Sequence, residues 1–225
     1  MSSNNMVSEN LNKIKLSLPK GVTLVAVSKT KPVSTIMEAY DAGQRVFGEN
    51  KIQEMVEKHE QLPKDIEWHM IGHVQSNKIK YMAPFVSLIH GVEKFKVLKE
   101  VNKQASKHNR SINCLLQIKI AEEDSKFGMS VNEAKAILKS DELKKLKHVN
   151  VTGVMGMATF TDDKKQIENE FKTLKSSFDE LKELESTNHD LRVLSMGMSG
   201  DYELAISCGS NMVRIGSSIF GERNY

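Results

Sequence analysis

Cysteine is nearly absent from the sequence, whose 225 residues include two, Cys114 and Cys208. Two cysteines cannot form a disulfide framework, and Cys114 lies in the apolar run INCLLQI, where a thiol behaves as a small buried hydrophobe. The chain also lacks an apolar run near the roughly 20 residues that a membrane span needs. Its polar start, MSSNNMVSEN, contains no signal-peptide core. These absences exclude a disulfide scaffold and predict a cytoplasmic protein that does not interact with membranes.

No charge of one sign dominates the chain. Lysine and arginine total 32 against 29 aspartate and glutamate residues, which gives a net charge of +3. The two signs are interspersed along the helical patterns, as on a solvated surface. This net positive charge is smaller than that of a typical nucleic-acid-binding domain. We therefore expect no nucleic-acid partner.

Short apolar runs alternate with helical patterns along the chain. The eight runs predicted as strands are 22–28, 45–48, 67–71, 86–89, 112–120, 151–157, 192–195 and 212–215. The helical patterns between them are 33–42, 51–59, 76–82, 94–107, 131–138, 164–184 and 200–207. Such alternation implies parallel strands with crossover helices. Eight strands in about 200 residues predict an α/β fold, a single (β/α)8 barrel of the TIM type. The alternative is an open, doubly wound sheet.

No repeat, low-complexity tract or linker interrupts the pattern, so residues 1–225 are predicted to form one domain. Within residues 1–20, Met6, Val7, Leu11 and Ile14 have helical spacing. We expect this N-terminal helix to pack against the outside or the bottom of the barrel. In such barrels the reactive residues lie at the carboxyl ends of the strands, and the loops after strands seven and eight often hold phosphate.

A lysine follows the first predicted strand, in the stretch TLVAVSKTKP. Lys29 would lie at the carboxyl end, where a low dielectric constant disfavours the ammonium form. A neutral amine can form an imine with an aldehyde. The alternative is a surface lysine in a loop. Lys31 is expected on the surface, because Pro32 forces it into an extended conformation before the next helix.

Small residues and hydroxyl groups follow the seventh and eighth strands, in LSMGMSGDYELAI and MVRIGSSIFGERNY. Gly197 and Gly200 allow close approach of the backbone, and Ser199 supplies a hydroxyl. A helix that begins near Gly200 would present its N-terminus to an anion. Gly216 and Ser217 repeat this chemistry in the second loop. The two loops together predict a ligand that carries a phosphate.

An arginine interrupts the last strand, in MVRIG. If Val213 and Ile215 face the helices, Arg214 faces the barrel interior, where an unpaired guanidinium is costly. A structural ion pair is the alternative to a contact with a ligand. An aldehyde-reactive lysine, a phosphate site and an interior arginine fit pyridoxal 5′-phosphate (PLP), with Arg214 facing the pyridine nitrogen. A cation there opposes protonation of the ring and weakens it as an electron sink.

Two further strand ends carry polar side chains. In FGEN, Glu49 or Asn50 would project toward the same mouth of the barrel. In WHMIGHVQSNK, His69 and His73 would span about 13 Å along a strand, which is too far to share a metal ion. We expect no metal site there, and we expect His69 to be a hydrogen-bonded residue of the core or the rim.

These motifs, together with AGQRVFGENKIQE, resemble those of the pyridoxal phosphate homeostasis protein family, also called the YggS-like family, from about residue 20 to the end. The resemblance implies a fold like the N-terminal barrel of alanine racemase, without that enzyme's second, β-rich domain. It also implies that Lys29 holds PLP as a Schiff base, because Lys29 matches the first lysine of the family's SKTKP. The predicted cofactor site comprises Lys29, Asn50, Ser199, Gly200, Arg214, Gly216 and Ser217.

The sequence departs from the family pattern at two places. His73 stands where many members have proline. Gly200 and Tyr202 lie in SGDYELA, where many members have SxDMxxA. The second departure alters the loop that is expected to hold the phosphate.

The resemblance implies a carrier without catalytic activity that acts in PLP and amino-acid homeostasis, with apo forms of PLP-dependent enzymes as candidate partners. A racemase needs a second acid–base group on the opposite face of the imine. In related enzymes that group comes from a second domain, and 225 residues spent on a barrel leave nothing to build one. The alternatives are a PLP-dependent amino-acid racemase and a class-I-aldolase-like barrel that acts on sugar phosphates. The helix faces show no apolar excess, so a monomer is expected.

Overall fold

The structure is a computed structural model that describes residues 6–122, 127–184 and 189–222. Among these residues, eight parallel strands pair in chain order and close into a barrel, with β8 hydrogen-bonded to β1. The strands are β1 (Thr23–Val27), β2 (Val46–Glu49), β3 (Glu67–Met70), β4 (Leu88–Val92), β5 (Ile112–Gln117), β6 (Val149–Met155), β7 (His189–Met198) and β8 (Met212–Ile215). The predicted (β/α)8 barrel is confirmed, and the closure excludes the open sheet.

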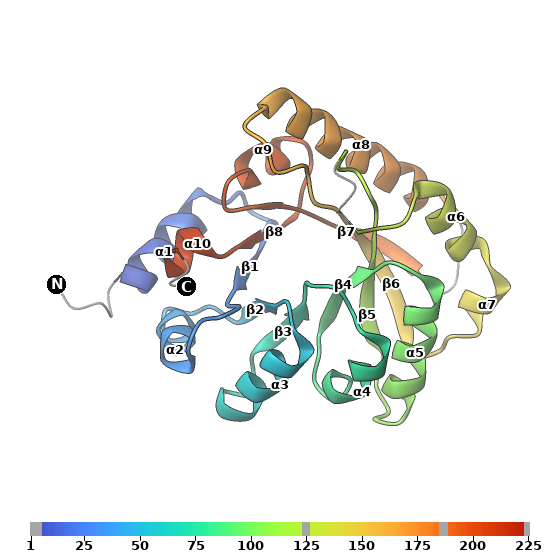
Figure 1. Cartoon of the computed structure of the whole chain (residues 1–225), viewed down its shortest axis with the longest axis horizontal. Helices are drawn as coiled ribbons and strands as arrows, with labels where there is room; N and C mark the ends of the chain where they lie inside the picture. Colours follow the sequence, from blue (N-terminus) through green and yellow to red (C-terminus); the bar gives the residue numbers. More distant parts are fainter. Residues whose placement is uncertain (1–5, 123–126, 185–188, 223–225) are drawn as a thin grey trace.

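Helices connect the strands and surround the barrel (Figure 1). Those in the described residues are α1 (Met6–Ser17), α2 (Val33–Asp41), α3 (Ile52–Gln61), the 3-10 turn η2 (Ser76–Lys78), α4 (Ile79–Met82), α5 (Phe95–Ser106), α6 (Val131–Lys139), α7 (Asp141–Lys144), α8 (Lys164–Lys182), α9 (Tyr202–Ser207) and α10 (Ser217–Phe220). Every predicted helical pattern is helical. The short helices α7 and α10 were not predicted, because one turn is too short to show a period.

Two apolar clusters lie on opposite faces of the strands. The larger one packs between strands and helices and includes Leu24 and Ala26 of β1. The smaller one joins side chains from β1, β4, β5, β6 and β8, which can meet only inside the barrel: Val25, Leu88, Leu115, Met155 and Met212. Successive residues of a strand point to opposite faces. In β8 this alternation places Met212 and Arg214 on the interior face.

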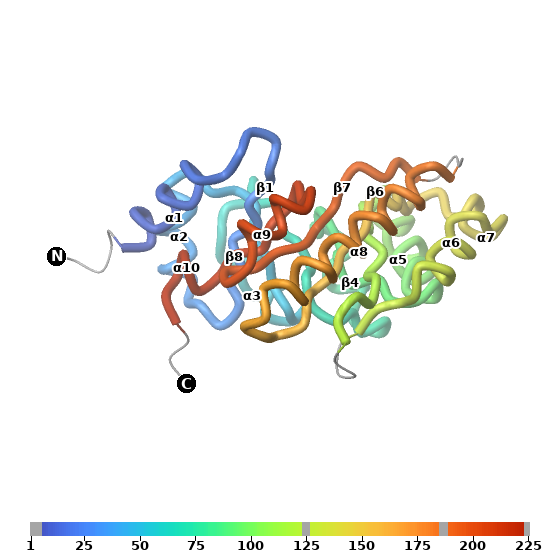
Figure 2. The backbone as a smooth tube through the Cα atoms, turned by 90° about the horizontal axis from the view of Figure 1, so that it is seen from above, coloured from blue at the N-terminus to red at the C-terminus, as the bar shows by residue number. Residues whose placement is uncertain are grey.

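Helix α1 packs on the outside of the barrel, beside α2 and α10. Figures 1 and 2 both show it alongside α10, near the start of β1. Val7, Leu11 and Ile14 are buried, as the spacing predicts, but Met6 is 62% exposed. Residues 1–5 of the predicted N-terminal segment lie outside the described residues.

β8 ends where predicted, β1, β2, β3 and β6 end within two residues of the predicted position, and β4, β5 and β7 end three residues away from it. β4 continues through His90 to Val92, because His90 is hydrogen-bonded inside the barrel rather than placed in a polar loop. β7 continues to Met198, which pairs with Arg214 of β8. β5 ends at Gln117, because the backbone beyond it turns to bond Met129: Lys119 donates its N–H to the Met129 carbonyl at 2.9 Å.

Candidate functional site

A cavity of about 530 Å³ opens at the carboxyl ends of the strands. All of the residues predicted for the cofactor site line it: Lys29, Asn50, Ser199, Gly200, Arg214, Gly216 and Ser217. They come from both ends of the chain, and the pairing of β8 with β1 brings those ends together. The structure thus collects the predicted residues around one space, while their roles toward a ligand stay predictions.

Lys29 follows β1 directly after the buried Ser28. It is partly buried and lines the cavity, so it is not a solvated loop lysine. The expectation for Lys31 was wrong. The Lys31 ammonium donates hydrogen bonds to the carbonyl oxygens of Phe220, Gly221 and Glu222 at 3.1, 3.2 and 3.1 Å. This side chain therefore joins the loop after β1 to the end of α10, instead of extending into solvent.

The loops after β7 and β8 are tied to one another. Gly197 has φ +99°, and a Cβ there would lie 2.7 Å from the Cβ of Ala205, so only glycine fits the turn into α9. Gly216 donates its N–H to the hydroxyl of Ser199 at 3.2 Å. A Cβ at Gly200 would meet no protein atom within 4 Å. The close approach expected at Gly200 is thus not made by the protein itself, and the space beside it is open.

Helix α9 begins at Tyr202, two residues after Gly200 and close to the predicted start. Asp201 forms the turn before it by accepting the Met198 backbone N–H through Oδ1 at 2.6 Å. α9 spans six residues and α10 spans four. Hydroxyls and backbone N–H groups of the two loops, rather than a long helix dipole, are therefore the donors available to an anion.

Arg214 extends into the barrel interior and is 3% exposed. Its guanidinium donates to the Ser195 hydroxyl at 2.5 Å and to the Gly156 carbonyl at 3.2 Å. Among the described residues no carboxylate forms an ion pair with it, so the structural ion pair considered from the sequence is not found there. Burial lowers the pKa of Arg214 to about 10, an effect opposed by Asp201, and the group remains charged at neutral pH.

A chain of hydrogen bonds continues from Arg214 across the interior. The Ser195 hydroxyl lies 3.0 Å from Nδ1 of His90, and Nε2 of His90 lies 3.0 Å from Nδ1 of His69. Burial lowers the pKa of His69 to about 3. Burial, together with His69 and Arg214, keeps the pKa of His90 well below its usual value. Both imidazoles are therefore neutral at pH 7, and Arg214 is held by uncharged partners.

The sequence interpretation identified only part of this interior network. It expected His69 to be hydrogen-bonded, which is confirmed. It missed His90, because it ended the fourth strand at Ile89, and it assigned no role to Ser195. A detectable signal existed: His90 stands two residues after the interior Leu88 within an apolar run, so the same face of the strand carries both.

The choice between Glu49 and Asn50 is resolved by burial. Asn50 lines the cavity, whereas the Glu49 carboxylate is fully buried behind it and accepts a hydrogen bond from the Ser28 hydroxyl at 2.7 Å. Gly72 makes this packing possible, since a Cβ there would lie 2.3 Å from the Asn50 carbonyl oxygen. His73 also lines the cavity, where it contacts Glu93 at 3.4 Å.

Positive charge predominates along the cavity wall. The cationic side chains that line it are those of Lys29, Lys31 and Arg214, while Glu93 supplies the carboxylate. Such a wall favours an anionic ligand. In the described ranges no cluster of three or more metal-ligating side chains occurs. No helix within the described part of the chain has the length and apolarity to cross a membrane.

Comparison with known proteins gives three results. Residues 3–224 match the family described as alanine racemase, N-terminal domain. A pyridoxal phosphate homeostasis protein of Haemophilus influenzae is 41% identical over 207 residues, which cover 91% of this chain and 86% of that protein. The structure of PipY from Synechococcus elongatus with PLP bound superposes with a TM-score of 0.87 at 32% identity, covering 96% of this chain and 100% of PipY.

Alanine racemase itself is similar in fold. The enzyme from E. faecalis superposes with a TM-score of 0.74 at 16% identity, covering 98% of this chain and 58% of the racemase. At this identity the similarity shows the barrel alone. This chain therefore covers most of the Haemophilus influenzae protein and all of PipY, but only the barrel-containing part of the racemase.

Proposed function

Because the chain belongs to the family of pyridoxal phosphate homeostasis proteins and carries the alanine racemase N-terminal domain, we propose that it binds PLP and helps to balance the cellular supply of this cofactor and of amino acids. One observation carries the proposal. A single cavity presents the Lys29 amine, the buried Arg214 guanidinium and the two loops that Ser199 and Gly216 tie together.

The residues present fit a phosphorylated aldehyde with an aromatic nitrogen. Open space beside Gly200 and donors on Ser199 and Ser217 suit a phosphate group. Arg214 holds only uncharged partners among the described residues, which leaves its charge available to the ring nitrogen. The aldehyde supplies the covalent link: its carbon bonds to the Lys29 nitrogen as its oxygen leaves as water.

The proposed role is storage and delivery rather than catalysis. A charged Arg214 would oppose protonation of a ring nitrogen beside it and so make the ring a weaker electron sink, which disfavours catalysis. The chain then acts as a monomeric cytoplasmic carrier that hands PLP to apo forms of PLP-dependent enzymes. The names of its relatives, which describe homeostasis, support this role.

Reductive trapping tests the proposal. Protein purified with PLP is expected to show the visible absorption of a protonated imine, and borohydride should remove that band and attach the label to Lys29. Lys29→Ala should abolish both signals and retain the fold. Lys20→Ala is the control, because this exposed lysine precedes the other end of β1 and is not among the residues that line this cavity.

Three results would contradict the proposal. If borohydride attaches the label to another side chain, or to none, the proposed binding of PLP at Lys29 is wrong. Racemisation of single L-amino acids well above the Lys29→Ala background would instead show a racemase. A colourless protein that is trapped by sugar phosphates would indicate an aldolase-like enzyme.

A further inference from the structure

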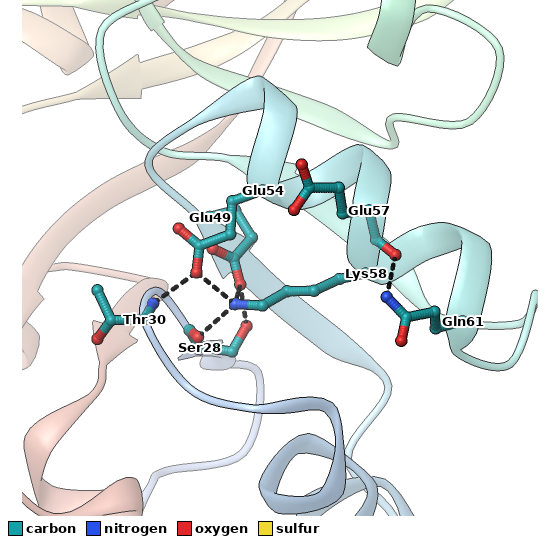
Figure 3. Close-up of polar contacts among 7 residues, drawn as sticks. All are labelled: Ser28, Thr30, Glu49, Glu54, Glu57, Lys58 and Gln61. Carbon is teal, nitrogen blue, oxygen red and sulfur yellow. Dashed lines mark hydrogen bonds and ion pairs between the residues drawn. The ribbon is translucent and has the colours of Figure 1, made fainter.

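A largely buried ionic cluster contacts Ser28 and Thr30, the two residues that flank Lys29 (Figure 3). Its centre is Lys58 of α3, which is 6% exposed. The Lys58 ammonium donates to Oε1 of Glu49 at 2.7 Å, to Oε1 of Glu54 at 2.7 Å and to the Ser28 carbonyl at 2.8 Å. We call Ser28, Glu49, Glu54 and Lys58 the Lys58 cluster. It connects the end of β1 to β2 and to the first half of α3.

The cluster holds both peptide groups that adjoin Lys29. On one side, Lys58 binds the carbonyl of Ser28, and that carbonyl belongs to the peptide linking Ser28 to Lys29. On the other side, Oε1 of Glu54 accepts the backbone N–H of Thr30 at 2.6 Å, and that N–H belongs to the peptide linking Lys29 to Thr30. A peptide group is planar, so fixing both planes fixes the two dihedral angles of Lys29. Those angles set the direction in which its side chain leaves the backbone.

Thr30 would not keep this conformation unaided. It has φ +64°, a left-handed value that is uncommon for a residue with a branched Cβ. Such a conformation is retained where surrounding contacts impose it, and it is typical of functional sites. Two contacts stabilise it here: the Thr30 N–H donates to the Glu54 carboxylate, and the Lys31 N–H donates to the Ser28 carbonyl at 3.0 Å across the same turn.

Stability alone is a poor explanation for the cluster. Burying the Glu49 carboxylate and the Lys58 ammonium costs desolvation energy that an apolar replacement would avoid, whereas the Glu54 side chain is partly exposed. Oε2 of Glu49 is buried without a hydrogen-bond partner among the described residues. Burial also raises the pKa of Glu49, against the opposing effect of Lys58. These features indicate an arrangement that fixes geometry at the expense of stability.

We propose that Glu54 and Lys58 are positioning residues that orient the Lys29 amine over the cavity. The inference rests on the proposed PLP binding at Lys29. Lys58 and Glu54 contact the backbone on either side of Lys29. The cluster should therefore strengthen the covalent capture of an aldehyde and leave the binding of the phosphate and the ring unchanged.

Two ligands and a matched pair of variants test this inference. PLP carries the aldehyde, and pyridoxine 5′-phosphate has a hydroxymethyl group in its place. Glu54→Ala should weaken PLP binding about tenfold, the effect expected from losing a charged hydrogen bond, and change pyridoxine 5′-phosphate binding less than about twofold. Glu57→Ala is the control, since Glu57 lies one turn further along α3 with its side chain exposed and outside the cluster.

The outcomes separate the inference from its premise. Glu54→Gln, whose amide oxygen still accepts from Thr30 and Lys58, should recover part of the PLP affinity. If Glu54→Ala binds PLP as tightly as Glu57→Ala does, or weakens both ligands equally, the positioning role is overturned. If the unaltered protein binds neither ligand, the proposed function itself fails.

Discussion

Arg214 is the most informative single residue in the cavity, because its guanidinium is buried and forms no ion pair with a carboxylate among the described residues. Arg214 bonds a hydroxyl and a carbonyl, and both of these acceptors are neutral. A protein that used this arginine only for stability would be expected to pair its charge, because an uncompensated buried charge is costly. The arrangement leaves the charge available to a ligand.

Replacing this arginine separates binding from folding. Arg214→Gln should weaken PLP binding about tenfold or more, because a charged hydrogen bond is lost, while the folded barrel persists. Titration followed by the visible absorption of the adduct measures the first effect, and urea unfolding measures the second. Arg192→Gln is the control, because that side chain is 64% exposed on β7. An Arg214→Gln protein that fails to fold would show a structural role instead.

At the scale of elements, helix α1 packs against α10, the short helix that follows β8 at the edge of the cavity. Leu11 is fully buried, and Asn10 of the same helix donates to the Ile219 carbonyl of α10 at 3.2 Å. α10 begins directly after Gly216, at the edge of the cavity. Packing of α1 therefore supports the loop that is proposed to contact phosphate.

Two leucines of α1 give a matched test of this packing. Leu11→Ala should lower the free energy of unfolding by about 2–5 kcal/mol through the lost burial and the cavity left behind. Leu16→Ala, at a position that is 87% exposed, should change it by less than about 0.5 kcal/mol. Urea unfolding monitored by circular dichroism provides both values. Equal effects of the two substitutions would show that α1 does not pack as described.

The elements also show how far a single sequence can be interpreted. Apolar runs located every strand, since a parallel barrel buries both faces of its strands. The ends were harder to place, because a polar residue such as His90 can lie within a strand when a partner inside the barrel satisfies it. The residues predicted from the family motifs all line one cavity. Lys58 was not predicted, since a lysine on an amphipathic helix is usually solvated, and its burial depends on contacts with β1 and β2.

At the scale of the whole molecule, the interior histidines couple folding to pH. The pKa of His69 is about 3 in the folded protein, against about 6.5 in an unfolded chain. Below pH 6.5 the unfolded state therefore binds a proton that the folded state does not. This contribution to stability is complete above about pH 6.5 and is lost as the pH falls toward 3.

Unfolding at several pH values checks this coupling. Between pH 6.5 and 5, His69→Gln should lose stability less steeply than the unaltered protein, by a difference that approaches about 1.4 kcal/mol per pH unit toward pH 5. His108→Gln, at an exposed position, should retain the steeper dependence. The expected difference comes from comparing the variants, so titration of the many surface carboxylates cancels. Identical slopes for all three proteins would mean that His69 is protonated in the folded state.

The pairing of β8 with β1 also determines when during its synthesis the protein can first hold a ligand. Lys29 leaves the ribosome well before Arg214 and Ser217, because these two residues lie in and directly after β8. Until these have emerged, the barrel is open and the nascent chain has an amine without the rest of its cavity. Under the proposed function, capture of the aldehyde is thus delayed until β8 and the loop after it have been made, and products truncated before β8 would not withdraw PLP from the cell.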